Sequence, residues 1–171
     1  MRILVVLSLF LCLFSCKQKA DKSEELVSQI DILSKEVDEN PLEVQPLLKR
    51  AKFNLNKKKY ESSLFDLNQC LKIDSTNGDC NYLAALCYFE ISKYDKSKSE
   101  YGKLALRTIK NALSSDQNNF LALALYGEIN IAYAKYKDAI EFFNKSLSIE
   151  YNQFEIHHLM GYAFKKLDQF D

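Results

Sequence analysis

The sequence predicts an all-α fold built from repeated helix pairs. The 171 residues include only two prolines and four glycines, so the turn residues that many short strands require are scarce. Apolar residues make up 47% and charged residues 27%, a balance typical of a folded chain. Similar runs of residues also recur along the chain, as expected of a solenoid. The formal net charge is zero and no basic stripe is present, so nucleic-acid binding is not expected.

Residues 1–15 are predicted to be a signal peptide. A single cation, Arg2, precedes an apolar run, and the composition turns polar at Lys17. This is the order of regions in a secretory signal. The apolar run is shorter than the roughly 20 residues that a membrane-spanning helix needs. A plain signal peptide or an uncleaved anchor are the alternatives to the lipidated form described next.

The end of this run resembles the bacterial lipobox, in the tetrapeptide Leu13-Phe14-Ser15-Cys16. The resemblance implies cleavage before Cys16 and attachment of diacylglycerol to its thiol. More than one acyl chain makes such anchoring stable. Lys17, and not Asp, follows the cysteine, which favours the outer membrane. Residues 16–23 then form a polar tether.

A lead-in helix is predicted over residues 24–39. Ser23 is a suitable N-cap, and Asn40-Pro41 is a suitable end. Spacings of three and four place the apolar residues of this segment on one helical face. These residues are Leu26, Val27, Ile30, Leu33 and Val37.

Two later segments, 47–77 and 120–153, share one pattern. Each has an aromatic residue followed three positions later by a small one, as in Tyr136 and Ala139. Each ends on a related run, Leu71-Lys72-Ile73-Asp74 or Leu147-Ser148-Ile149-Glu150. The pattern resembles the tetratricopeptide repeat (TPR) family, and the match is best at Tyr126-Gly127 and Tyr136-Lys137-Asp138-Ala139-Ile140. The family has a 34-residue helix–turn–helix period.

The resemblance implies a right-handed α-solenoid with four segments: TPR 1 at 41–77, TPR 2 at 78–119, TPR 3 at 120–153, and half a repeat or a capping helix at 154–171. TPR 2 carries about eight extra residues near 93–103. Either its turn is an enlarged loop, which we favour, or both helices are about one turn longer. The last segment either caps the array or indicates a fragment of a longer TPR lipoprotein.

In the TPR family, first helices line a concave face that binds peptides through apolar anchors. The register implies a groove of Leu48, Lys52, Leu55, Tyr82, Leu86, Phe89, Leu121, Glu128, Ile131, His158 and Tyr162. Alternatively, several of these residues pack against the lead-in helix or an inserted loop. The carboxylate clamp of chaperone adaptors is not expected, because the matching positions hold leucines that donate no hydrogen bond.

No catalytic, metal or cofactor motif is apparent, so an enzyme is not expected. His157 and His158 are adjacent and diverge on a helix, and His157 is predicted to be core. Cys70 and Cys87 are predicted to act as small apolar residues. Cys80 starts a predicted helix, where exposure is favoured. A disulfide between Cys70 and Cys80 is possible in an oxidising compartment, but the register does not obviously bring the two together, so free thiols are favoured.

The sequence therefore predicts a protein-interaction scaffold or adaptor. It would be lipid-anchored in the bacterial cell envelope, in the outer membrane facing the periplasm, with envelope proteins or peptides as its partners. The alternatives are a fragment of a longer TPR lipoprotein and a lipoprotein that binds glycans or small molecules.

Overall fold

The computed structural model describes residues 29–94 and 99–168, and the chain forms two units, Met1–Pro41 and Leu42–Asp171. In the first unit residues 29–39 are helical, within the predicted lead-in helix. The side chain and the backbone amide of Asn40 both donate to the Glu36 carbonyl and end this helix. The predicted signal peptide, the predicted lipidation site Cys16 and the predicted tether lie outside the described residues.

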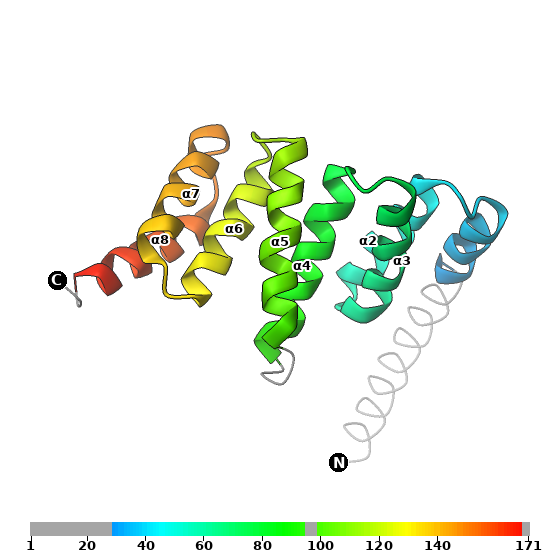
Figure 1. The fold of residues 1–171 in the computed structure, drawn as a ribbon, viewed down its shortest axis with the longest axis horizontal. Helices are drawn as coiled ribbons and strands as arrows, with labels where there is room; N and C mark the ends of the chain where they lie inside the picture. The colour runs from blue at the N-terminus through cyan, green and yellow to red at the C-terminus, as the bar shows by residue number, and fades with distance from the viewer. Residues whose placement is uncertain (1–28, 95–98, 169–171) are drawn as a thin grey trace, which may run out of the picture. The chain divides into compact units, whose positions relative to one another are not determined.

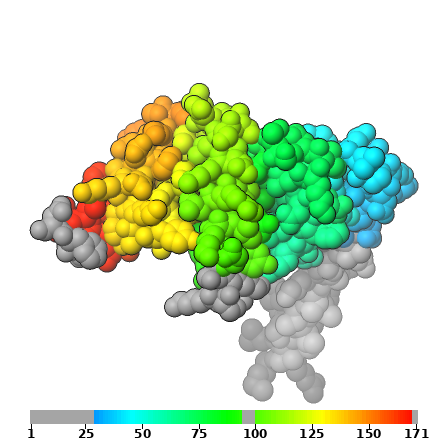
Figure 2. Space-filling model, in the orientation of Figure 1, coloured from blue at the N-terminus to red at the C-terminus, as the bar shows by residue number. Residues whose placement is uncertain are grey.

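The second unit is a chain of helix pairs, shown in order in Figure 1. Its described residues contain helices and turns and no strand. Helices contact their chain neighbours, and the first helices of successive pairs also touch. The colours in Figure 2 accordingly follow one another as bands across α4 to α8. The helices are α2 (Val44–Asn56), α3 (Tyr60–Ile73), α4 (Gly78–Tyr94), α5 (Ser99–Ser115), α6 (Phe120–Ala132), α7 (Tyr136–Ile149) and α8 (Phe154–Leu167).

The second pair is longer than its neighbours. The helices α4 and α5 have 17 residues each, whereas α2 and α6 have 13 and α3 and α7 have 14. Most of the extra residues therefore extend the helices, and the enlarged loop that we favoured is wrong. The added turn is helical because it has apolar residues to bury: Ile91 is only 5% exposed, and Tyr88 stacks on Tyr101 at 5.6 Å.

The turns inside the first and third pairs share one backbone conformation. Lys58 and Ala134 both adopt a left-handed backbone, with φ of 57° and 56°. The following amides, of Lys59 and Lys135, each donate to a carbonyl five residues back at 2.9 Å. These features define a Schellman end, which satisfies the last carbonyls of α2 and α6 and starts the next helix.

The turns between pairs also repeat. In each, a carboxylate accepts a hydrogen bond from the backbone amide two residues later, and Asn77 and Asn119 then cap α4 and α6 through their side chains. The hydrogen bonds from the hydroxyl and the backbone amide of Thr76 lower the pKa of Asp74, the first of these carboxylates. The three carboxylates are those of Asp74, Asp116 and Glu150.

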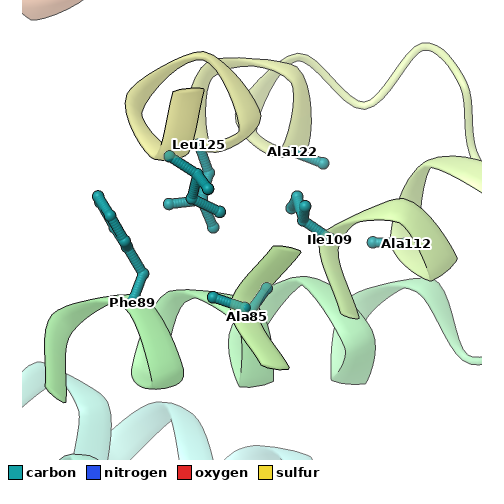
Figure 3. Packing of buried hydrophobic residues seen from close by; sticks show 8 residues of the cluster. Ala85, Phe89, Ile109, Ala112, Ala122 and Leu125 are labelled. Carbon is teal, nitrogen blue, oxygen red and sulfur yellow. The ribbon is translucent and has the colours of Figure 1, made fainter. Parts of the chain in front are cut away.

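Small residues let the helices pack closely around a core shared by α4, α5 and α6. Figure 3 shows Ala85 and Phe89 of α4 facing Ile109 of α5 and Leu125 of α6. Ala85, Ile109 and Ala122 are completely buried. A second cluster joins α6, α7 and α8 around Phe143. Because one helix pair cannot bury its own apolar face, stacking of pairs creates the core.

A disulfide joins the first and second pairs, contrary to our prediction. Cys70 at the end of α3 and Cys80 at the start of α4 are bonded, with Cα atoms 6.5 Å apart. Both are completely buried, so Cys80 is not the exposed cysteine that we expected. The short turn between α3 and α4 folds the chain back and brings these two positions together.

The thiol of Cys87 is free and completely buried in α4. Burial raises the pKa of Cys87 to about 11, and a hydrogen bond with Ser63 opposes this shift. The thiol is therefore protonated at neutral pH, and it has neither the charge nor the access needed to attack the neighbouring disulfide.

Candidate functional site

A cavity of about 380 Å³ opens between the first helices of three successive pairs. Five residues from the predicted groove line it: Lys52, Leu55, Tyr82, Leu86 and Leu121. The remaining lining residues are Asn56, Asp79, Leu83 and Asn119.

Helical spacing explains why these side chains share the cavity. Lys52 and Leu55 are three residues apart on α2, and Tyr82 and Leu86 are four apart on α4, so each pair lies on one face of its helix. Leu121, on the first turn of α6, completes the site and is 46% exposed. The result is an apolar hollow of the size and composition of a binding site.

Polar groups surround the hollow. Lys52 and Asp79 form an ion pair at 3.2 Å, with about half of each side chain exposed. A pair this exposed contributes little stability, so its separation would cost little. The amides of Asn56 and Asn119 add donors and acceptors beside the apolar floor.

Two predicted groove residues are not accessible. Leu48 is 4% exposed and Phe89 is 5% exposed, and Phe89 belongs to the core of α4, α5 and α6. Their placement in the groove is therefore wrong. Ile131 is half-buried and packs against the cluster around Phe143. The repeat register of the sequence did not distinguish residues that face the concave surface from residues buried between adjacent helices.

Glu128 is a half-buried carboxylate on α6, also from the predicted groove. Burial raises the pKa of Glu128; the carboxylates of Glu155 and Glu90 act in the same direction, and the ammonium of Lys93 opposes them. Burial likewise raises the pKa of Tyr82, with further contributions from Glu128 and Asp79. A carboxylate thus lies within electrostatic reach of the cavity wall.

The predicted groove residues of α8 do not line the cavity. His158 is exposed, and Tyr162 is 42% exposed, edge-on to Tyr136 at 6.3 Å. His157 is half-buried and not the core residue that we predicted: its ring lies against Tyr151, with Nε2 3.1 Å from the Tyr151 carbonyl oxygen.

A second cavity, of about 400 Å³, was not predicted. It lies among α5, α6 and α7, and Ile149, 46% exposed, is on its wall. Lys145 of the same wall lies over the ring of Phe142. Nothing in the sequence indicated this hollow, because the exposure of Ile149 is evident only in the structure.

Two other kinds of feature are absent from the described residues. Within 29–94 and 99–168, no three His, Cys, Asp or Glu side chains gather as metal ligands. None of the helices described is both long enough and apolar enough to cross a bilayer.

Comparison with solved structures identifies the fold. MamA from Desulfovibrio magneticus RS-1 matches with a TM-score of 0.72 at 15% identity, covering 88% of this chain and 81% of MamA. TTC0263, a TPR protein of Thermus thermophilus, matches with a TM-score of 0.70 at 13% identity, covering 83% of this chain and 74% of the other. The chain has the tetratricopeptide-repeat fold.

A third TPR structure contains a bound peptide. The first TPR of Spaghetti (RPAP3), bound to the HSP90 peptide SRMEEVD, matches with a TM-score of 0.65 at 17% identity, covering 73% of this chain and 93% of that domain. All three matches are too remote to show more than the fold. No protein-family model and no curated protein sequence matches this chain.

Proposed function

We propose that this protein is a membrane-anchored adaptor of the bacterial cell envelope that binds a peptide segment of a partner protein. One observation carries the proposal: side chains from α2, α4 and α6 converge on a single apolar hollow with a polar border. A hollow lined by the first helices of successive repeats forms an apolar groove, which is the kind of surface that binds an extended or helical peptide. The peptide bound by RPAP3 supports this use of the fold.

Two further features support the envelope location. The segment ending at Leu13-Phe14-Ser15-Cys16 has the composition of a lipoprotein signal. The disulfide between Cys70 and Cys80 is of a kind that persists in oxidising compartments such as the periplasm. Together they favour a scaffold that faces the periplasm and is held at the outer membrane by lipid on Cys16.

The groove assignment is tested by in vivo cross-linking and affinity capture of the full chain with two matched variants. Leu121→Asn removes an apolar anchor from the proposed groove, and Ile149→Asn does the same in the second cavity; both wild-type side chains are 46% exposed. Captured partners should fall about tenfold with Leu121→Asn, equivalent to about 1.4 kcal/mol, and stay unchanged with Ile149→Asn. Loss with Ile149→Asn alone would transfer the function to the second cavity.

The anchor is tested separately by Cys16→Ala. The variant should lose the acyl chains and leave the detergent phase of a two-phase partition, or accumulate unprocessed. Metabolic labelling with a palmitate analogue should mark the wild-type chain only. An unlabelled wild-type chain would contradict the lipid anchor and leave the groove assignment standing.

A further inference from the structure

The apolar hollow determines one part of the ligand. Leu55, Leu86 and Leu121 come from three different helices, and the ring of Tyr82 lies beside them. Leu121 keeps nearly half its surface exposed, so burying it against a ligand gives a direct hydrophobic gain. An aliphatic side chain is the simplest occupant.

The charged residues lining the hollow, Lys52 and Asp79, balance each other, and the excess of carboxylates lies beside the hollow, around Glu128. Lys52 is paired with Asp79, and Lys93 with Glu90, so each of these two ammoniums already has a carboxylate partner. Lys93 also lies over the ring of Phe89, at 4.7 Å, which holds it in place. The lysines of α8 lie in its last turn, whereas Glu155 lies in its first.

In the described part of the chain, Glu128 and Glu155 are two carboxylates without a paired cation. Among the residues that the structure describes, neither the half-buried Glu128 nor the exposed Glu155 takes part in a hydrogen bond or an ion pair. Two carboxylates, those of Glu155 and Glu90, act electrostatically on Glu128, and one ammonium, that of Lys93, opposes them. A second cation near Glu128 would therefore relieve a local excess of negative charge.

The positions of Leu121 and Glu128 on α6 set the distance between the apolar hollow and the carboxylates. Leu121 and Glu128 are seven residues apart on α6, two turns of one face, which is about 10 Å along the helix axis. An extended peptide spans that distance in about three residues.

We infer that the groove recognises a segment in which an aliphatic side chain is followed or preceded, about three residues away, by a lysine or arginine. The inference rests on the proposed peptide-binding function and specifies its ligand. The aliphatic side chain enters the hollow of Leu55, Leu86 and Leu121, and the cation meets Glu128 and Glu155. This preference is opposite in sign to the acidic peptide SRMEEVD bound by RPAP3.

Selection from a random nonapeptide library displayed on phage tests the inference, with the full-length chain as bait and the Leu121→Asn chain as counter-selection. Recovered sequences should contain Lys or Arg about three residues from an aliphatic residue. In synthetic copies of a recovered peptide, replacing that cation by Glu should weaken binding about tenfold or more. Rising salt should reduce the difference.

Charge variants locate the contact. Glu128→Gln combined with Glu155→Gln should bring the Lys-over-Glu affinity ratio to about one. Glu141→Gln, which removes an exposed carboxylate paired with Lys145 on α7, should leave the ratio unchanged. A ratio that survives the double variant would overturn the assigned contact.

The two proposals fail in different ways. Peptides that depend on Leu121 but are neutral or acidic would overturn the charge preference and leave the groove intact. If no peptide distinguishes the wild-type chain from Leu121→Asn, the groove itself is refuted and this inference with it.

Discussion

The first and third helix pairs have the same backbone and different chemistry at equivalent positions. The helices have identical lengths in the two pairs, and each residue of the first lies 76 positions before its counterpart in the third. Between α2 and α3, Arg50 donates two hydrogen bonds to Asp66, at 2.7 and 3.0 Å. At the same two positions between α6 and α7, the rings of Tyr126 and Phe142 pack at 4.1 Å. The first and third pairs therefore fill the same packing position in two ways, one with a salt bridge and the other with an aromatic pair.

The contact to the following pair varies in the same way. The disulfide between Cys70 and Cys80 has Ala112 and Ala122 as its counterparts in the second pair, all four completely or almost completely buried. In the third pair the hydroxyl of Ser146, at the position of Cys70, donates to the Phe120 carbonyl at 2.8 Å. The residues at the position of Cys70 in the three pairs are all small, and the first pair differs in having a disulfide there.

The largest expected effect comes from breaking the buried ion pair. Asp66 is 2% exposed at its side chain and Arg50 16%, so Asp66→Ala leaves a largely buried guanidinium without its bidentate acceptor. We expect the free energy of unfolding to fall by about 3–4 kcal/mol, measured by urea denaturation.

A transplant of the aromatic pair provides the control. Arg50→Tyr combined with Asp66→Phe copies the solution of the third pair, and stability should return to within about 1 kcal/mol of the wild type. If the double variant is as unstable as Asp66→Ala, the two positions are not interchangeable and the comparison fails.

Removal of the disulfide should have the next largest effect. Closure of a ten-residue separation constrains the unfolded chain by about 3 kcal/mol. Cys70→Ala with Cys80→Ala should cost about that much, because buried alanines already occupy the equivalent positions in the second pair. Reductant should destabilise the wild type by a similar amount and leave the double variant unaffected; an equal response of both would place the redox effect elsewhere.

Two equivalent glycines should respond in opposite directions to alanine. A Cβ on Gly127 would lie 2.3 Å from the ring of Phe143, which is completely buried, whereas a Cβ on Gly161 of α8 meets nothing within 4 Å. We expect Gly127→Ala to cost about 2 kcal/mol through overpacking. Gly161→Ala should gain up to about 1 kcal/mol from helix propensity. Thermal melts of the two variants separate these effects, and a loss at Gly161 would show that α8 is covered in solution.

The sequence predicted the repeated features well and the exceptions poorly. The helix pairs followed from recurring residues such as Tyr136 and Ala139, because a repeated packing geometry requires repeated residue sizes. The length of α4 and α5 did not follow, because the extra residues have no counterpart in the other repeats. Ile91 and the Tyr88–Tyr101 stack decide it through tertiary packing.

The candidate site was predicted in part for a similar reason. Helical period identified five residues of the cavity wall, since a face is a property of one helix. It placed Phe89 on the same face, although that ring packs into the core shared by α4, α5 and α6. The disulfide was missed because helical period says nothing about which helix ends meet across a turn.

The smallest effect comes from the feature that the first and third pairs share most closely. Lys58 and Ala134 adopt a left-handed backbone, which costs a residue with a Cβ about 1 kcal/mol or more and costs glycine almost nothing. Glycine loses more entropy on folding, so the net gain from Lys58→Gly or Ala134→Gly should be about 0.5–1 kcal/mol. Both side chains are exposed, so no packing is lost. Equal gains at both sites in urea denaturation would show that the two turns are energetically as well as geometrically equivalent, and a loss at either would mean that its side chain makes a contact that outweighs the backbone term.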